Sequence, residues 1–155
     1  CSNFSNMFAG ASKFNNGIQN DIADQNNVGN PLKFTFKETG SSGDPPRCDY
    51  MFSGALVFNA PIYHWQNTGS IKYMNQMFNY AIKFNQEVRT WDVTGIFTDG
   101  GNHTGMFTNA TAFLASDTKW NTQNEKPGLD FWKSWTAYEV GGITYEPHPN
   151  TLALT

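Results

Sequence analysis

One phrase, Met-Phe-x-x-Ala-x-x-Phe, occurs four times and constrains the fold more than any other feature of this chain. Its methionines are 44, 26 and 29 residues apart, which indicates a unit of about 26 residues with a long insertion in the first copy. One unit cannot bury its own apolar side chains, but stacked units can bury them against each other. The predicted repeat core contains Met7, Phe8, Ala11, Phe14, Met51, Phe52, Ala55, Phe58, Met77, Phe78, Ala81, Phe84, Met106, Phe107, Ala110 and Phe113.

Each copy can be numbered from its methionine as position zero. At 100° per residue, positions −3, 0, +4 and +7 fall on one side of a helix, with +1 at its edge. Good helix N-caps stand at −2, and asparagines suited to a left-handed turn stand at +8 in three copies. The phrase therefore predicts a short capped helix of two to three turns. The −2 residues are Ser5, Asp49, Asn75 and Thr104, and the +8 asparagines are Asn15, Asn59 and Asn85.

The second half of each unit is predicted to be extended. Position +14 is tryptophan in three copies, Trp65, Trp91 and Trp120, and these residues join the predicted core. Each unit then comprises an extended segment, a turn, a short helix and another turn. We expect about four such coils over residues 1–120, followed by a C-terminal cap over residues 121–155.

The best copy, MFNYAIKFNQEVRTWDV at Met77 to Val93, resembles the 25–26-residue repeat of surface proteins known as the DUF285 or BspA-like repeat. The resemblance covers about residues 1–120. It implies an α/β repeat solenoid similar to leucine-rich repeats, as found in bacterial surface proteins and lipoproteins, protist and algal surface proteins and large DNA viruses. It implies no catalytic residues and no cofactor.

The insertion, at about residues 27–47, departs from the repeat. The segment Leu32–Lys37 alternates like a strand, and Gly40–Pro46 is rich in turn residues, so we expect a β-excursion that leaves the stack. It is either a partner-binding loop or a tolerated surface insertion.

Aromatic residues are concentrated in the C-terminal segment. Trp132, Trp135 and Tyr138 are expected to cover the open end of the stack. The alternative is an exposed platform that stacks against sugar rings.

Two cysteines occupy nearby positions in the first and second copies. Cys1 and Cys48 could form a disulfide, or Cys48 could be a small buried residue with Cys1 unpaired. Because the chain starts at Cys1 with no initiator methionine, we interpret it as a processed form or a fragment.

Three N-x-S/T sequons, at Asn3, Asn102 and Asn109, are candidate glycosylation sites. The three histidines are far apart in the sequence, and no metal site is predicted.

Composition limits the partners and the location. The net charge of −3 and the scattered lysines and arginines argue against nucleic acid as a partner. The absence of an 18-residue apolar run argues against direct membrane insertion. Only 15% of residues are charged, so neutral polar side chains must solvate the surface, which is typical of extracellular, cell-surface and virion proteins.

We therefore expect a non-enzymatic structural building block of an extracellular or virion surface assembly. Its partners would be proteins, either copies of itself or other surface or capsid proteins. One alternative is an adhesion module that binds a glycan or a host surface protein. Another is a solenoid glycoside hydrolase, which would require two carboxylates in a cleft.

Overall fold

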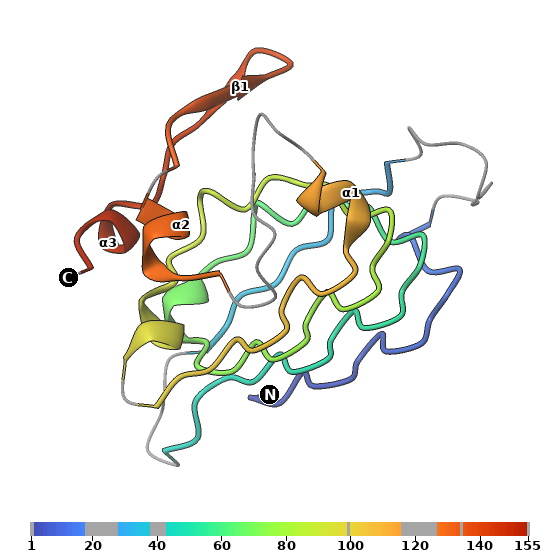
Figure 1. Cartoon of the computed structure of the whole chain (residues 1–155), viewed down its shortest axis with the longest axis horizontal. Coiled ribbons are helices and arrows are strands. Elements are labelled where there is room, and N and C mark those ends of the chain that lie inside the picture. Colours follow the sequence, from blue (N-terminus) through green and yellow to red (C-terminus); the bar gives the residue numbers. More distant parts are fainter. Residues whose placement is uncertain are drawn as a thin grey trace.

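The computed structural model describes residues 2–17, 28–37, 43–98, 100–115, 127–133 and 135–154. Figure 1 shows successive lengths of backbone lying side by side in sequence order, from the blue N-terminal segment to the orange one. The helices and strands in these residues are short. They are the 3-10 turns η1 (Thr68–Ser70) and η2 (Thr94–Phe97), the helical turns α1 (Thr111–Leu114), α2 (Leu129–Lys133) and α3 (Pro149–Leu152), and the strands β1 (Tyr138–Val140) and β2 (Ile143–Tyr145).

The repeated phrase forms a string of tight turns, and the expected two-to-three-turn helix is wrong. In the second copy, the N–H groups of Met51, Ala55 and Phe58 donate to the carbonyl three residues earlier, at 3.0–3.2 Å. Positions −1 and +3 have positive φ, from 49° to 73°, in all four copies. Such residues fit the third position of a type II turn and interrupt an α-helix. The residues with positive φ are Asn6, Gly10, Tyr50, Gly54, Gln76, Tyr80, Gly105 and Asn109.

The turns leave every second N–H group free to bond to the next copy. The N–H groups at −3, −1, +1 and +3 of each copy donate to carbonyls of the following copy, at 2.7–2.9 Å. Phe52, for example, donates to Met77, and Phe78 donates to Met106. Parallel bridges at position −4 connect Asn3, Arg47, Tyr73 and Asn102 in that order. We call this assembly of the four copies the repeat stack.

The polar residues at −2 connect neighbouring copies instead of capping helices. The Asp49 carboxylate accepts a hydrogen bond from the Asn75 N–H at 3.0 Å. The Asn75 side-chain oxygen accepts in turn from the Thr104 N–H at 3.1 Å.

The asparagines at +8 form a second ladder. The side-chain oxygen of Asn15 accepts from the Asn59 N–H at 2.8 Å, and that of Asn59 accepts from the Asn85 N–H at 2.9 Å. None of the three has positive φ, so the predicted left-handed role is wrong. The side chains of Asn15 and Asn59 each satisfy a backbone donor of the next copy, which a buried turn requires.

Two columns of stacked phenylalanine rings form the centre of the core. Neighbouring rings along each column are 5.4–5.9 Å apart with nearly parallel planes. Within each copy the two rings stack at 4.0–4.2 Å. The first column is Phe8, Phe52, Phe78 and Phe107, and the second is Phe14, Phe58, Phe84 and Phe113.

A shorter column of indoles lies beside them. Trp65 and Trp91 stack at 5.0 Å, and their indole N–H groups donate to the carbonyls of Leu32 and Ile62. Trp120 lies outside the described residues.

The insertion was expected to leave the stack, but its described part packs against the stack instead. The N–H of Phe36 donates to the Gln66 carbonyl, and the N–H of Gln66 donates to the Phe34 carbonyl. Phe36 is fully buried against Trp65 and Phe4. Burying the apolar surface of Phe36 in the first coil is more favourable than exposing it on an excursion. The sequence of the first copy has Asp21 where other copies have tryptophan.

The C-terminal segment covers the last copy and the side of the stack. Trp132 of α2 is fully buried, with its ring centroid 6.5 Å from that of Phe107. Strands β1 and β2 pair antiparallel, with Val140 opposite Ile143, in a hairpin that extends away from the stack in Figure 1. The whole is a compact domain with few short helices around a large buried aromatic core.

Candidate functional site

A polar cleft of about 800 Å³ lies where the C-terminal segment meets the second and third copies. Turn η1 forms one wall, Asp92 and Thr94 form another, and His148 and Asn150 border it from the cap. The sequence Pro149-Asn150 starts α3 directly after His148, because proline fits the first turn of a helix. That start places the Asn150 side chain against the repeat stack.

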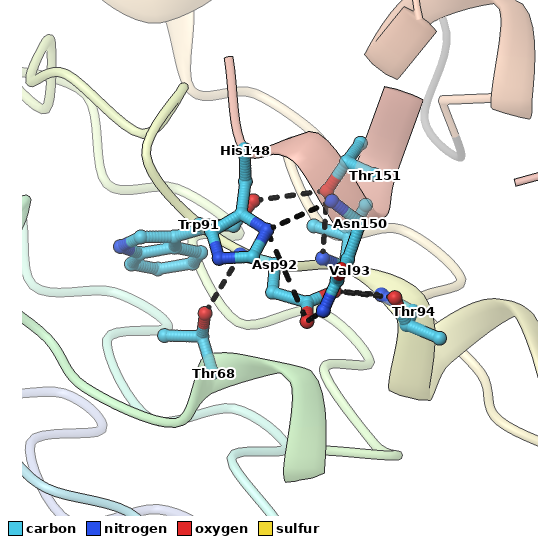
Figure 2. A network of polar contacts seen from close by, with 8 residues as sticks. All are labelled: Thr68, Trp91, Asp92, Val93, Thr94, His148, Asn150 and Thr151. Carbon is cyan, nitrogen blue, oxygen red and sulfur yellow. Dashed lines mark hydrogen bonds and ion pairs between the residues drawn. The ribbon is translucent and has the colours of Figure 1, made fainter. Parts of the chain in front are cut away.

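Asp92 is the centre of a polar network at this junction (Figure 2). Its N–H donates to the Thr68 hydroxyl at 2.9 Å. Its carboxylate accepts hydrogen bonds from the N–H and hydroxyl of Thr94 and from the side-chain amide of Asn150. The Nδ1 atom of His148 lies 4.0 Å from the same carboxylate. The backbone N–H and the carboxylate of Asp92 together therefore join two repeat copies to the cap.

These contacts stabilise the charged form of Asp92. Burial on its own would raise the pKa of the carboxyl group, but hydrogen bonds from Thr94 and Asn150 and the nearby His148 outweigh it. The pKa of Asp92 therefore lies below its ordinary value, and the group is ionised at neutral pH.

Thr151 and His148 complete the docking of α3. The buried Thr151 hydroxyl donates to the Trp91 carbonyl and accepts from the Val93 N–H, both at 3.1 Å. The backbone N–H of His148 donates to the Arg89 carbonyl at 3.1 Å, while its ring accepts from the Asn150 N–H. Figure 2 shows these groups converging on the Trp91–Thr94 segment.

The cleft offers polar contacts more than reactive groups. Among the described residues that line the cleft, Asp92 is the one carboxylate. In the described part of the chain, no group of three or more metal-ligating side chains is gathered. The same residues include no helix long and apolar enough to cross a bilayer.

A buried ion pair lies next to the hairpin. The guanidinium of Arg89 and the carboxylate of Glu87 are 2.9 Å apart, and both side chains are almost fully buried. Burial, a hydrogen bond with Tyr63 and the Glu87 charge raise the pKa of Tyr145 to about 12. Tyr145, whose ring lies 5.0 Å from that of Tyr63, anchors the base of the hairpin to the stack.

The first copy exposes side chains whose equivalents in the later copies are buried. Met7 is 45% exposed, whereas the equivalent Met51, Met77 and Met106 are fully buried. Phe8 and Phe14 are half-buried, although their column neighbours in later copies are fully buried. In Figure 1 this blue segment forms one edge of the stack. We call this surface, made by Ser5, Met7, Phe8, Ala9 and Phe14, the N-terminal face.

Of the two cysteines in the candidate disulfide, the structure describes Cys48. Cys48 is a free, fully buried cysteine in the core, and Cys1 lies outside the described residues. Burial, assisted by the charge of Asp49, raises the pKa of the Cys48 thiol. The pairing with Cys1 stays a prediction.

The three sequons lie on the turn strings. Asn3 and Asn109 are exposed, and Asn102 is partly buried. The side-chain oxygen of Asn102 accepts from the N–H and hydroxyl of Thr104, its own sequon residue. Their use for glycosylation stays a prediction.

The C-terminal tryptophans do not form an exposed aromatic platform. Trp132 is fully buried and Trp135 is 6% exposed, with their rings 4.9 Å apart. Covering the end of the phenylalanine columns removes both indoles from solvent. The side chain of Tyr138 lies outside the described residues.

Sequence reasoning missed the residues around the cleft. Asp92 was noted only as part of the Trp-Asp-Val segment, and Asn150 and Thr151 follow no repeated pattern. One local signal was present, since His148 precedes a proline at the start of a helix. Nothing in the sequence indicated that this helix would dock on the third copy.

Comparison with known proteins gives one match. The family described as "Mycoplasma protein of unknown function, DUF285" matches residues 1–41 and 46–139. The match confirms the resemblance and extends it beyond residue 120, through α2 and into β1. No curated protein and no solved structure matches the chain.

Proposed function

The chain belongs to the DUF285 family, and from that premise we propose that it is a leucine-rich-repeat-like α/β solenoid that serves as a non-enzymatic structural building block. It would act through protein–protein contacts in an extracellular, cell-surface or virion assembly. Its partners would be copies of itself or other surface or capsid proteins.

The solenoid interpretation is supported by the regularity of the stack. The same four backbone positions bond to the next copy at each of the three junctions, and the same ring positions stack along two columns. Each copy thus contacts mainly its neighbours, as in other repeat proteins. Extended segments with turns η1 and η2 take the place of regular strands and helices.

The N-terminal face is the observation that carries the functional proposal. An apolar side chain that is fully buried in three copies is half-exposed in the first, so the face has the chemistry of an interior surface. Apolar surface of this kind favours association because burying it is worth roughly 25 cal/mol per Å². Covering Met7, Phe8 and Phe14 with a protein partner would complete the two phenylalanine columns.

Sedimentation analysis of the purified chain over a range of concentrations tests this function. We expect the chain to associate increasingly as its concentration rises. Met7→Glu should abolish this association, because it places a charge in the contact. The matched control is Ile143→Glu, which changes an equally exposed apolar residue on the hairpin. Association that survives Met7→Glu would overturn the proposal. So would a wild-type chain that stays monomeric at every concentration and binds nothing in isolated surface material.

The polar cleft supports adhesion to a glycan as a second candidate function. Asn67, Asp92, His148 and Asn150 provide amide, carboxylate and imidazole groups of the kind that bind sugar hydroxyls. A glycan array tests it, with Ser70→Trp as the variant that fills the cleft. Binding that is lost in Ser70→Trp would support this candidate, and a blank array would remove it.

A further inference from the structure

The hydroxyl groups on the wall of the polar cleft donate their protons to the protein itself. The Thr90 hydroxyl donates to the Tyr63 carbonyl at 3.0 Å, and the Thr94 hydroxyl donates to the Asp92 carboxylate. A hydroxyl group has one proton and two lone pairs, so both threonines keep lone pairs for a further partner. Beside Asp92, the cleft therefore offers oxygen acceptors to a ligand.

Asp92 gives the described wall of the cleft a negative charge at neutral pH. The pKa of its carboxyl group is lowered, and its side chain is 16% exposed. The described residues that line the cleft include no lysine and no arginine. The Nδ1 atom of His148 accepts from the Asn150 N–H, as it does in a neutral imidazole. The charge of Asp92 thus has no full counter-charge on this wall.

The Asp92 carboxylate also keeps room for a further donor. It accepts three hydrogen bonds, from the N–H and hydroxyl of Thr94 and from the Asn150 side-chain amide. A carboxylate has about four lone-pair sites, so about one is left. A partly buried carboxylate attracts a cation more strongly than one in bulk water, because the local dielectric constant is lower. The group that fits best beside Asp92 is therefore a cation that carries N–H donors.

Resting on the second candidate function, the binding of a glycan, we infer that the cleft selects amino sugars with a free amine over N-acetylated and acidic sugars. The ammonium group has three donors and no acceptor, and it would lie beside Asp92 and the Thr94 hydroxyl oxygen. N-acetylation removes the charge and two of the donors. A sugar carboxylate would add a second negative charge beside Asp92. The side-chain amides of Asn67 and Asn150 remain for the neutral hydroxyls.

Calorimetric titration of the full chain with three trisaccharides tests this selectivity. The probes are the trimers of glucosamine, N-acetylglucosamine and galacturonic acid. At neutral pH the glucosamine trimer should bind about fivefold to tenfold more tightly than its acetylated form, because hydrogen bonds to charged groups are stronger than neutral ones. The galacturonic acid trimer should bind most weakly. Added salt should reduce the difference, since it screens the charge of Asp92.

Two variants assign the preference to the charge of the cleft. Asp92→Asn should bring the affinities for the glucosamine and N-acetylglucosamine trimers within about twofold of each other. Because Asp92 also holds α3, Ser70→Lys provides an independent test that keeps the carboxylate. It places an ammonium group in the cleft and should reverse the preference in favour of the galacturonic acid trimer. The matched control is Ser12→Lys, the same change at an exposed position outside the cleft.

The outcomes separate the selectivity from the function beneath it. If another glycan binds at least as tightly as the glucosamine trimer, and Ser70→Trp abolishes its binding, the selectivity is wrong and the glycan function stands. If Ser70→Lys leaves the preference unchanged, the charge of the cleft does not select the ligand and the inference fails. If a trilysine peptide binds as tightly as the glucosamine trimer, the cleft recognises amines in general, which overturns the choice of amino sugars. If no glycan binds, both fail.

Discussion

Phe84 shows how much a single position contributes to a stacked core. Its fully buried ring lies 5.9 Å from Phe58, 5.6 Å from Phe113 and 4.1 Å from Phe78. No neighbour can move into the space without breaking a column, so Phe84→Ala should lower the free energy of unfolding by about 3–5 kcal/mol. Denaturant unfolding measures this.

The control for Phe84 is its equivalent in the first copy. Phe14 is half-buried, and among the described residues its ring stacks on one neighbouring copy, through Phe58. Phe14→Ala should therefore cost clearly less than Phe84→Ala. Equal losses at the two positions would contradict the view that the first copy is uncovered.

Asp92 makes the junction between the stack and the cap sensitive to acid. Its pKa is depressed in the folded state, so its contribution is present above the pKa of the unfolded carboxyl, about 3.9, and is lost as the pH falls through the folded value. We expect Asp92→Asn to be less stable than the wild type at pH 6, and the difference to narrow below about pH 4. Unfolding free energies measured at several pH values provide the test.

Asp44→Asn is the matched variant for this experiment, because Asp44 is an exposed carboxylate outside the cleft. A constant difference between wild type and Asp92→Asn down to pH 2 would show that the charge of Asp92 does not stabilise the cap.

At the scale of elements, the sequence specified which residues are buried but not their backbone conformation. Side chains at −3, 0, +4 and +7 face one side in a helix, and a string of four-residue turns has nearly the same period. The discriminating signal was at −1 and +3, where Asn6, Gly10, Gly54, Gly105 and Asn109 favour positive φ. Tyr50, Gln76 and Tyr80 obscure it, because their side chains are uncommon in that conformation.

The candidate sites were less predictable than the core. Burial of the repeat phrase depends on neighbours that carry the same pattern, so the sequence contains both sides of each contact. The cleft depends on Asp92 meeting Asn150, 58 residues away in a segment without repeats. The exposure of the first copy was not foreseen either, because Met7, Phe8 and Phe14 occupy the same repeat positions as residues that are buried in the later copies.

The close packing of turn η2 requires a glycine at position 95. A Cβ atom at Gly95 would collide with the carbonyl oxygens of Ile71 and Gly69 in the copy beneath it. These are backbone atoms that cannot move without disturbing η1, so Gly95→Ala should destabilise the protein by about 1–3 kcal/mol or more. Thermal unfolding checks this against Gly128→Ala, where a Cβ would meet no atom within 4 Å. Equal stability of the two variants would contradict the close packing of η1 and η2.

For the whole molecule, the stack has two different ends. The last copy is covered by α2 and the buried Trp132, whereas the first copy exposes Met7. The side of the stack near Trp91 is occupied by α3. The proposed function uses this asymmetry, since it places the contact with a protein partner at the N-terminal face.

The central claim is that the repeated phrases bond to one another copy by copy, and scalar couplings across hydrogen bonds in NMR spectra test it most directly. We predict couplings from the Phe52 amide nitrogen to the Met77 carbonyl carbon, and from that of Phe78 to that of Met106. Couplings from Ala55 to Met51 within one copy would instead indicate an α-helix. That result would contradict the ladder of hydrogen bonds between the copies.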